Sequence, residues 1–506
     1  MVYYGPTPRG DATSPTAAFP TPLTTTATIH TNPTTTTLVC DLGSSTIKVG
    51  FAGQLTPELI LPCVIGTPRK SPPSSREKST TSSGAEQSVD GVVLGPEALR
   101  RGTNYPPKIG YTYPMTTGHV QDWTAVELLL KHALRTCLCR RRRRPQQREE
   151  EENDNGADDY SSYQILLTWP YNMTTRDLQH LVELFLVTFG FRGLTLHKQA
   201  ALVLYAQGVD SGVVVELGET TTNLIPVYQG HALSHLDRTL PLGGRTISTY
   251  LLQLLRRKGY PFLNDRDARH VEFGRYLKER VCYAAYDSTV DDKLATDTTV
   301  LMESFQVPTE MLGTTLPSAG TTITVGRERF GAVEALFAPS QTLLLNCGDN
   351  ESGGLADMIF DLIQDADMDC RSDLYQHIIL SGGTALVPGL QERVQKDITH
   401  RYTNEVLRTG RNRTHNGRGG GVFSCDSSSS SSSLSPTSSF DSSSSSSSSL
   451  GWKPQVHTPK SRPHLVYEGA ALFADYIAED HRYWVRREEY VREGMQCIFD
   501  KCTVQK

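Results

Sequence analysis

The chain has 506 residues, with 50 Lys or Arg against 55 Asp or Glu, which gives a formal net charge of −5. This balance excludes a strongly basic nucleic-acid-binding protein, although it leaves room for a local basic patch. At roughly 100–200 residues per domain, the length allows about two to four domains or lobes.

No stretch of the sequence is long and apolar enough for a membrane helix, and the first residues lack the basic-then-apolar pattern of a secretory signal. The ten cysteines form no Cys-x-x-Cys pair, and several lie in apolar stretches. Reduced thiols are therefore expected, in a cytoplasmic protein without membrane insertion. A metal site at Cys137 and Cys139 is the alternative, but no second pair of His or Cys ligands stands close by.

Four polar segments have compositions that cannot repay the entropy of ordering. They are a tail rich in Thr and Pro, a Ser/Thr/Pro insertion, a run of arginines joined to a run of acids, and a segment with two serine runs. We predict that these segments are disordered: residues 1–37, 70–90, 139–162 and 403–460. The basic run 140–144 is expected to be solvated and neutralised by the acidic run, with a nuclear address or an acidic partner as alternatives.

Between these segments, strand-like and helix-like stretches alternate. Short apolar runs bounded by turn residues predict strands, and apolar residues three and four positions apart predict helices. This alternation indicates an α/β fold. In chain order we expect strands at 38–40 and 47–51, a helix at 126–138, a strand at 165–167, a helix at 176–189, a strand at 213–215, a helix at 248–257, a strand at 378–380 and a helix from Leu390.

Two hairpin-like stretches repeat one pattern. In each, an apolar strand ends in a carboxylate, and Leu-Gly, a hydroxyl-rich turn and a returning strand follow. The first carboxylate is Asp41 and the second is Glu216. Repetition of a supersecondary unit indicates two related lobes.

The repeated pattern suits a nucleotide phosphate. Backbone N–H groups of a glycine turn form a concave anion site, and a carboxylate at the strand end can hold the waters of a Mg²⁺ that bridges phosphates. Lys48, on the first returning strand, can supply a point charge. Either hairpin alone is explained more simply as a turn in which glycine supplies a positive φ, so it is the pair that favours a nucleotide clamp.

A third glycine motif follows the strand at 378–380. It consists of Ser381, Gly382, Gly383 and Thr384. Paired glycines after a strand let a flat ring or a ribose approach the backbone closely. The order hairpin, hairpin, Gly-Gly matches a nucleotide-binding architecture.

With these motifs the chain resembles actin and the actin-related proteins, of the same superfamily as sugar kinases and the Hsp70 nucleotide domain. The resemblance covers nearly all of the chain outside the four polar segments. It implies an α/β, actin-like ATPase fold, with two lobes of duplicated βββαβα-type domains that form four subdomains around a nucleotide cleft. The stretches that carry it are 39–53, 113–123, 165–168, 199–208, 212–230, 242–260, 276–286, 327–339, 363–389 and 467–501.

The resemblance also divides the chain into subdomains. The insertion at 70–90 falls where the family has its pointed-end contact loop, and such polar filler would disfavour ordinary filament self-assembly. Subdomain 1 would comprise residues 38–62, 114–206 and 465–506, subdomain 2 residues 63–113, subdomain 3 residues 207–242 and 345–464, and subdomain 4 residues 243–344.

The resemblance implies ATP and Mg as cofactors and a role for each matching position. Asp41 and Glu216 would face the metal through water, and Gln199 would orient the attacking water. Without the resemblance, Gln199 is an ordinary polar helix residue. The residues that would contact the nucleotide are Gly43, Ser44, Ser45, Lys48, Gly218, Glu219, Thr220, Arg275, Lys278, Glu279, Gly382, Gly383 and Thr384.

Several positions depart from the family's pattern and weaken hydrolysis. Thr220 stands where a Gly lets the phosphate approach, and Glu219 is one methylene longer than the usual Asp. Asn223 cannot shuttle a proton as the usual His can, and Pro463 stands where a Lys usually touches the adenine. A misplacement of about 1 Å can cost roughly 100-fold in rate, so we expect slow ATP hydrolysis at most, while binding survives through backbone donors.

The function that the resemblance implies is structural. The chain would be an ATP-binding subunit of a multiprotein complex that nucleates branched actin filaments, and it would mimic an actin dimer together with a second actin-related protein. Its partners would be that protein, the other branching-complex subunits and the actin filament, in the cytoplasm at the actin cytoskeleton.

Two alternatives stay open. One is a nuclear actin-related protein of a chromatin complex, or a scaffold that needs no nucleotide; the arginine run and the altered turns favour it. The other is a phosphotransferase or chaperone ATPase of the superfamily. Against the latter, the sequence offers no separate catalytic base for a sugar pocket and no substrate domain.

Overall fold

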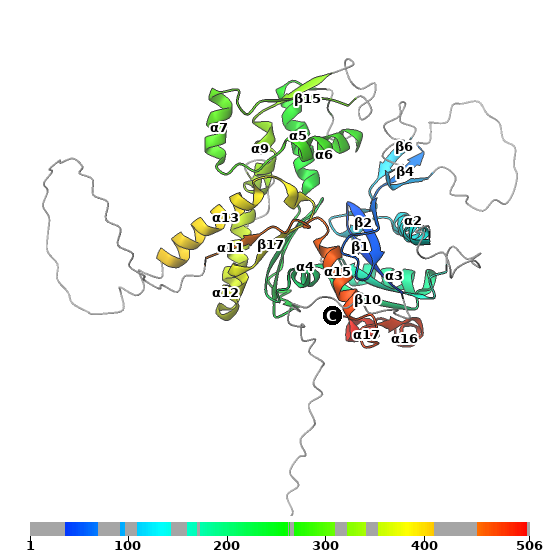
Figure 1. Cartoon of the computed structure of the whole chain (residues 1–506). Coiled ribbons are helices and arrows are strands. Elements are labelled where there is room, and N and C mark those ends of the chain that lie inside the picture. The colour runs from blue at the N-terminus through cyan, green and yellow to red at the C-terminus, as the bar shows by residue number, and fades with distance from the viewer. Residues whose placement is uncertain are drawn as a thin grey trace, which may run out of the picture.

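The computed structural model describes residues 36–68, 92–96, 109–142, 159–169, 173–261, 263, 268–308, 321–340, 353–408 and 453–502. Strands and helices alternate through these residues and form two lobes, each built on a mixed sheet (Figure 1). The expected α/β fold is confirmed. Among the described residues, no helix has both the length and the apolarity needed to cross a bilayer, and the eight cysteines are free thiols.

The first lobe contains a six-stranded sheet in which alternate residues face opposite sides. Its strands are β1 (Thr36–Leu42), β2 (Thr46–Phe51), β3 (Leu59–Pro62), β9 (Tyr163–Trp169), β10 (Gly193–Lys198) and β19 (Val485–Arg486), in the order β19-β10-β9-β1-β2-β3. Leu38 and Cys40 of β1 belong to one hydrophobic core, whereas Val39 belongs to another on the opposite face. Both faces of the sheet are therefore covered, as the unbroken apolar run of β9 requires.

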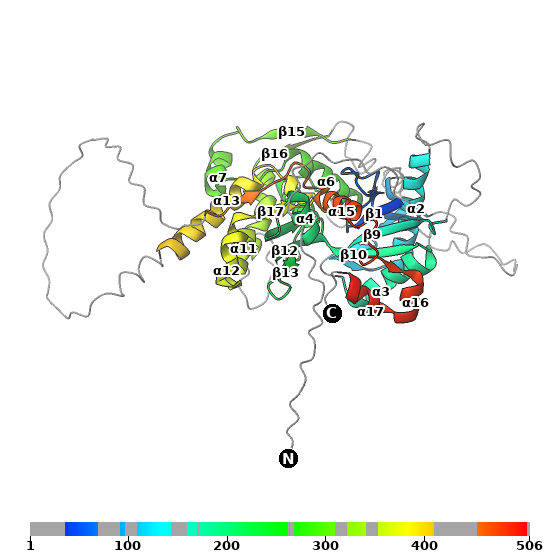
Figure 2. The same ribbon diagram turned by 60° about the horizontal axis from the view of Figure 1, so that its bottom comes forward.

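Helices of the first lobe include α2 (Trp123–Arg142), α3 (Thr175–Glu183), α16 (Arg487–Glu493) and α17 (Met495–Lys501). Figure 2 shows α16 and α17 beside α3. A small sheet extends from this lobe, and a short hairpin follows it. The sheet consists of β4 (Ile65–Pro68), β5 (Val93–Leu94) and β6 (Ile109–Thr112), and the hairpin of β7 (Met115–Thr116) and β8 (His119–Val120).

The second lobe repeats the strand plan of the first. Its sheet has the order β13-β12-β11-β17-β18, with β14 paired to β12. The strands are β11 (Gly212–Leu217), β12 (Thr222–Tyr228), β13 (His231–Ala232), β14 (Arg238–Leu240), β17 (Ile378–Ser381) and β18 (Val456–His457). The run β18-β17-β11-β12-β13 matches β10-β9-β1-β2-β3 of the first lobe strand by strand, with the same parallel and antiparallel pairings. The expected duplication of the lobes is confirmed.

Helices of the second lobe pack on this sheet, and some of them extend the lobe beyond it. Helix α11, for example, buries Leu355, Ile359 and Ile363 along one side. The helices are α5 (Gly244–Lys258), α6 (Ala268–Val281), α7 (Ser288–Asp297), α9 (Glu328–Gly331), α11 (Leu355–Asp365), α12 (Met368–Gln376) and α13 (Leu390–Arg401), and the hairpin β15 (Glu303–Gln306) with β16 (Thr322–Val325) completes the lobe.

Two helices join the lobes: α4 (Gln199–Gln207) and α15 (Leu465–Tyr476). Leu202 of α4 packs in the core that contains Val39 of the first sheet, whereas Val203 packs in the core that contains Val214 of the second. Helix α4 is apolar on more than one face because both sheets cover it. Gly469 lets α15 approach α4 closely, since a Cβ there would collide with the Leu202 carbonyl.

The prediction that residues 139–162 are disordered is wrong for the first and last residues of that segment. Helix α2 continues to Arg142, because Arg140 Nη1 donates to the Glu58 carbonyl at 2.8 Å and the Arg141 guanidinium lies over the Phe51 ring. At the other end Tyr160 is buried and stacks on Phe191. These contacts come from residues distant in sequence. Residues 143–158 lie outside the described part of the chain.

The segment predicted at 403–460 also has structured ends. A π-helical turn, Tyr402–Arg408, continues α13, and β18 lies inside the predicted segment. Gln395 fastens the returning chain to α13, because its Nε2 donates to the Pro454 carbonyl and its Oε1 accepts from the Val456 N–H. The predicted tail 1–37 likewise overlaps β1, which pairs with β9 from Thr36 onward. The predictions for residues 1–35, 70–90 and 409–452 concern residues outside the described part of the chain.

Candidate functional site

A cavity of about 570 Å³ lies between the lobes, where β1 and β11 end. This volume is within the range of small-molecule sites, about 300–1,000 Å³. The residues that the sequence analysis assigns to nucleotide, metal and water positioning come from both lobes, and all of them line this cavity. They are Asp41, Gly43, Ser44, Ser45, Lys48, Gln199, Glu216, Gly218, Glu219, Thr220, Arg275, Lys278, Glu279, Gly382, Gly383 and Thr384.

The turns that follow Asp41 and Glu216 are closed by the same backbone hydrogen bond. The Gly43 N–H donates to the Thr46 carbonyl at 3.1 Å, and the Gly218 N–H donates to the Thr221 carbonyl at 3.0 Å. In both turns a Cβ on the glycine would press against that same carbonyl. The repeat seen in the sequence is therefore a repeat of backbone structure, in which the close approach explains the glycine.

The residues that face the two carboxylates across the hairpins differ. Asp41 stands directly opposite Lys48 in the β1–β2 ladder, and Glu216 stands directly opposite Asn223 in the β11–β12 ladder. Cross-strand neighbours of this kind are within reach of each other. The first carboxylate thus has a cationic partner, and the second has a neutral one.

Asp41 is held as an anion. It is 3% exposed, and its Oδ2 lies 2.8 Å from Lys48 Nζ. The Thr168 hydroxyl donates to Oδ1 at 2.6 Å. Burial alone would raise the pKa of Asp41, but the Lys48 ammonium and the hydrogen bonds from Thr168 and Gln199 outweigh it and hold that pKa below its usual range.

Glu216 is the opposite case. It is 8% exposed, and among the described residues its buried Oε1 has no hydrogen-bond partner. Burial raises the pKa of Glu216 to about 7; a hydrogen bond from Asn223 opposes the rise, and the Asp41 and Asp237 carboxylates add to it. A buried carboxyl oxygen without a partner, facing a cavity, is suited to a cation or its bound water.

Gln199 begins α4, and its amide contacts the first carboxylate. Its Nε2 donates to Asp41 Oδ1 at 3.1 Å and lies 3.3 Å from Thr168 Oγ1. In this arrangement the amide supports the Asp41 carboxylate. The donor of that amide is therefore engaged by protein oxygens in this structure.

Glu219 and two cations link the second turn to the helices of the second lobe. Lys278 is 6% exposed; its Nζ donates to the Gly244 carbonyl and lies 4.0 Å from Glu219 Oε2. Burial raises the pKa of Glu219 although Lys278 and Arg245 oppose the rise. The Arg245 N–H also donates to the Glu219 carbonyl at 2.7 Å. The turn is therefore fastened to the start of α5.

The motif Ser381–Thr384, which follows β17, lines one side of the cavity. The Thr384 hydroxyl donates to the Gly218 carbonyl at 2.7 Å, which ties this motif to the second turn. Gly382 has a φ of +96°, and a Cβ there would collide with the Leu217 carbonyl, so glycine is required by the protein itself. At Gly383, by contrast, a Cβ would meet open space.

Sequence reasoning missed several residues that complete the site. Thr168 is fully buried at the end of β9 and holds Asp41, a role that a strand-end hydroxyl alone does not reveal. His464 also lines the cavity, and burial together with the nearby Lys48 lowers the pKa of its imidazole. Leu386, Val387 and Pro388 add an apolar wall.

The donor set fits a nucleotide with a divalent cation. Glu216 offers a buried oxygen without a partner among the described residues, and Gly383 leaves open space at the cavity wall. Lys48, Arg275 and Lys278 supply positive charge to the same cavity. Carboxylates, point cations and glycine turns are the groups that bind phosphates and their magnesium ions.

Comparison with known proteins assigns the fold to a family. The model of the Actin family matches residues 32–503. The chain is 31% identical over 461 residues to actin-related protein 2 of Arabidopsis thaliana, with 91% of this chain and 97% of that protein covered. The actin-related protein 2 of Oryza sativa, from both subspecies japonica and indica, has the same identity and coverage. The family match spans both lobes and the cavity between them, and the chain belongs to the actin family.

Proposed function

We propose that the cavity between the lobes binds ATP with Mg²⁺. The observation that carries this proposal is that two turns closed by the same backbone hydrogen bond, each preceded by a buried carboxylate, face one cavity from opposite lobes. The glycine turns would hold the phosphates, Lys48 would supply charge, and Asp41 and Glu216 would hold the waters of Mg²⁺. When bound, Mg²⁺ would neutralise phosphate charge.

The remaining residues of the site would bind the nucleoside and its phosphates. Arg275, Lys278 and Glu279 would border the ribose and adenine on one side, and Gly382, Gly383 and Thr384 on the other. Gly218, Glu219 and Thr220 would form the second phosphate turn. In support, these residues converge on one cavity although they are far apart in sequence.

We propose that hydrolysis is slow at most. Gln199, the residue that would orient water, donates to Asp41 rather than into the open cavity. Asn223 faces Glu216 and has no proton to exchange at neutral pH. Thr220 also adds a β-branched side chain to a turn that would have to approach the phosphates closely. Binding depends less than catalysis on such placement.

We further propose that the chain acts as an actin-related protein 2-like subunit of a complex that nucleates branched actin filaments. It would stand beside a second actin-related protein, mimic an actin dimer with it, and contact the other branching-complex subunits and the actin filament. The support is similarity along nearly the whole of proteins named actin-related protein 2, of which 97% is covered. Its location would be the cytoplasm, at the actin cytoskeleton.

Mg-ATP is expected to raise the melting temperature of the full chain. A ligand that binds only the native state adds roughly 2.7 kcal/mol at about 100 times its dissociation constant, which corresponds to a shift of about 3–6 °C. Thermal melts with Mg-ATP, Mg-GTP, and ATP with EDTA measure the shift, its base preference and its metal dependence. A melting temperature that no nucleotide changes would leave the nucleotide-independent scaffold as the better explanation.

A tagged full-length chain is expected to recover a second actin-related protein and the other branching-complex subunits from extracts of its own cells. Mass spectrometry identifies the recovered proteins, and a tag-only sample is the control. Fluorescent tagging of the same chain is expected to label the cortical cytoplasm. Recovery of chromatin-complex subunits together with a purely nuclear signal would instead support the nuclear alternative.

A further inference from the structure

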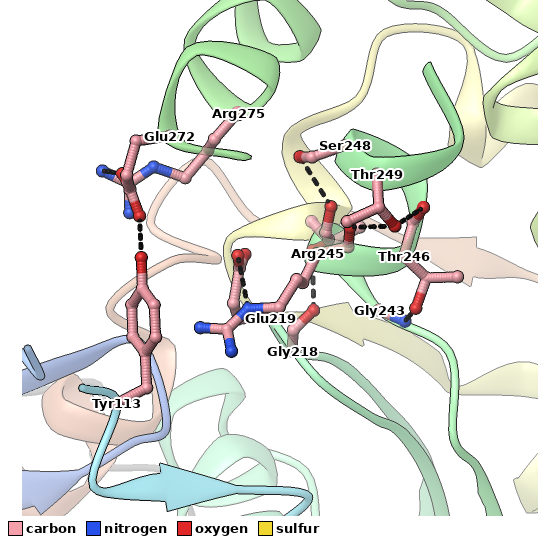
Figure 3. A network of polar contacts seen from close by, with 12 residues as sticks. Tyr113, Gly218, Glu219, Gly243, Arg245, Thr246, Ser248, Thr249, Glu272 and Arg275 are labelled. Atoms are coloured by element: carbon pink, nitrogen blue, oxygen red, sulfur yellow. Dashed lines mark hydrogen bonds and ion pairs between the residues drawn. The ribbon is translucent and has the colours of Figure 1, made fainter. Parts of the chain in front are cut away.

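A group of polar side chains joins the lobes beside the cavity. Tyr113, in the chain between β6 and β7, extends from the first lobe towards α5 and α6 of the second (Figure 3). Its hydroxyl donates to Glu272 Oε1 at 2.5 Å. Arg275, one helical turn further along α6, lies 3.1 Å from Glu272 Oε2. One carboxylate thus receives a hydrogen bond from the first lobe and an ion pair from its own helix.

The ring of Tyr113 is held between the lobes as well. On its own side it packs with Val93 of β5 and with Val64, which directly precedes β4. From the other side, the Arg245 guanidinium lies 3.9 Å from the ring centroid. A cation this close to an aromatic face is attracted to it, more strongly where water is partly excluded. The small sheet is therefore fastened to α5 as well as to α6.

Arg245 contacts the second carboxylate turn at the same time. Its Nε lies 3.9 Å from Glu219 Oε1, and its backbone N–H donates to the Glu219 carbonyl. Figure 3 shows Arg245 between Tyr113 and Glu219. Arg245 therefore contacts Tyr113, which joins the lobes, and Glu219, which lines the cavity.

These contacts are shielded from water. The side chains of Glu272 and Arg245 are 15% and 24% exposed. Burial raises the pKa of the Tyr113 phenol, and the adjacent Glu272 raises it further, so the hydroxyl remains a donor throughout the neutral range. A hydrogen bond to a charged group in such surroundings is among the stronger ones.

We propose that Tyr113 is a positioning residue that latches the two lobes over the cavity and, through Arg245, holds the Glu219 turn in place. This inference rests on the proposed nucleotide site, although the latch consists of protein groups alone. When a latch closes a cleft, ligand enters and leaves only during openings. Weakening the latch therefore speeds both entry and exit of a nucleotide.

The test measures association and dissociation of a fluorescent ATP analogue with Mg²⁺ by stopped flow, on the full chain. Tyr113→Phe keeps the ring beside Arg245 and removes only the hydroxyl, and Glu272→Gln keeps an acceptor without charge. In Tyr113→Phe each rate constant is expected to rise roughly tenfold, the factor that corresponds to one lost hydrogen bond to a charged group, while the dissociation constant changes little. In Glu272→Gln the hydrogen bond to Tyr113 is weakened rather than removed, so both rate constants are expected to rise by less; because Glu272 also pairs with Arg275 of the proposed site, the dissociation constant of this variant is not used as a criterion. Tyr276→Phe is the matched control, because it removes a hydroxyl from α6 outside the cavity lining.

Two results would overturn the latch. One is unchanged rates in both variants, and the other is a rise in the dissociation rate alone in Tyr113→Phe, which is the behaviour of a lost nucleotide contact. If the wild-type chain binds no analogue, the proposed nucleotide function fails, and hydrogen exchange of the free protein then decides the latch. Amides of β6 exchange several-fold faster in Tyr113→Phe than in wild type if the latch exists, and equally fast if it does not.

Discussion

Replacing Glu216 with glutamine is expected to stabilise the ligand-free protein at neutral pH and to abolish the stabilisation by Mg-ATP. Glutamine keeps the shape of the side chain and a partner for Asn223, but it removes a carboxyl that burial makes costly to ionise. The same substitution removes the charge that would hold the waters of Mg²⁺. Chemical unfolding and thermal melts of both proteins, with and without Mg-ATP, measure the two effects.

The pH dependence of the unfolding free energy tests whether ionisation of Glu216 is the cause of the expected stabilisation. The pKa of Glu216 is raised from 4.5 to about 7 in the native state, so the unfolded state loses its proton first as pH rises. The wild type therefore loses stability between about pH 4.5 and pH 7, by about 3 kcal/mol in all and by about 2 kcal/mol between pH 5 and pH 7.5. Glu216→Gln gains relative to wild type over that window and not below it.

An exposed carboxylate provides the control for this substitution. Glu479→Gln changes the same net charge at the surface, where no such pH-dependent gain is expected. A gain for Glu216→Gln that is equal at pH 5 and pH 7.5 would mean that ionisation of Glu216 does not limit stability. Stabilisation by Mg-ATP that survives in Glu216→Gln would remove this carboxylate from the proposed metal site.

Replacing Lys48 with methionine is expected to cost about 3–5 kcal/mol of unfolding free energy, because it leaves the buried Asp41 without its countercharge. The hydrogen bonds from Thr168 and Gln199 keep the cost towards the lower end of that range. The double variant Asp41→Asn with Lys48→Met is expected to recover most of the loss. Urea unfolding of the wild type, the two single variants and the double variant gives the four free energies of a double-mutant cycle, from which the coupling between Asp41 and Lys48 follows.

The sign of the pH dependence is opposite for this pair. The native pKa of Asp41 lies below its usual value, so the pair contributes stability above that usual value and loses it as the pH falls through the native pKa. The cost of Lys48→Met should therefore shrink in acid. Lys293→Met removes an exposed ammonium and serves as the control. An equal loss in Lys48→Met and in the double variant would show that the packing of the Lys48 stem, and not its charge, is what matters.

The sequence predicts which residues come together at the candidate cavity, because the motifs that carry them are local. A carboxylate at a strand end followed by Leu-Gly specifies a tight turn, and two copies of that unit predict two sheets of the same topology. Parallel pairing of β1 with β9 and of β11 with β17 then brings the strand ends together. The buried strands also stand out from their surroundings, since the runs at Val213 and Ile378 are apolar on both faces.

The parts that escaped prediction depend on contacts between distant segments. Nothing near Tyr113 in the sequence indicates Glu272, and nothing near Asp41 indicates Thr168 as its donor. The end of α2 is a similar case, because composition favoured a solvated arginine run, whereas Glu58 and Phe51 hold two of those arginines. Local pattern fixes the elements, but it carries no information on such pairs.

The two hairpins share a backbone plan, but the residues that face their carboxylates differ: Lys48 faces Asp41, and Asn223 faces Glu216. With Lys48 beside it, Asp41 leaves the first hairpin close to electrical neutrality, whereas the pair of Glu216 and Asn223 gives the second hairpin one negative charge once the carboxyl ionises. At the proposed site, an extended anion that carries its counter-ion at one end would gain most when that end faces the second hairpin. Two copies of one backbone plan can thus distinguish head from tail in a ligand by chemistry alone.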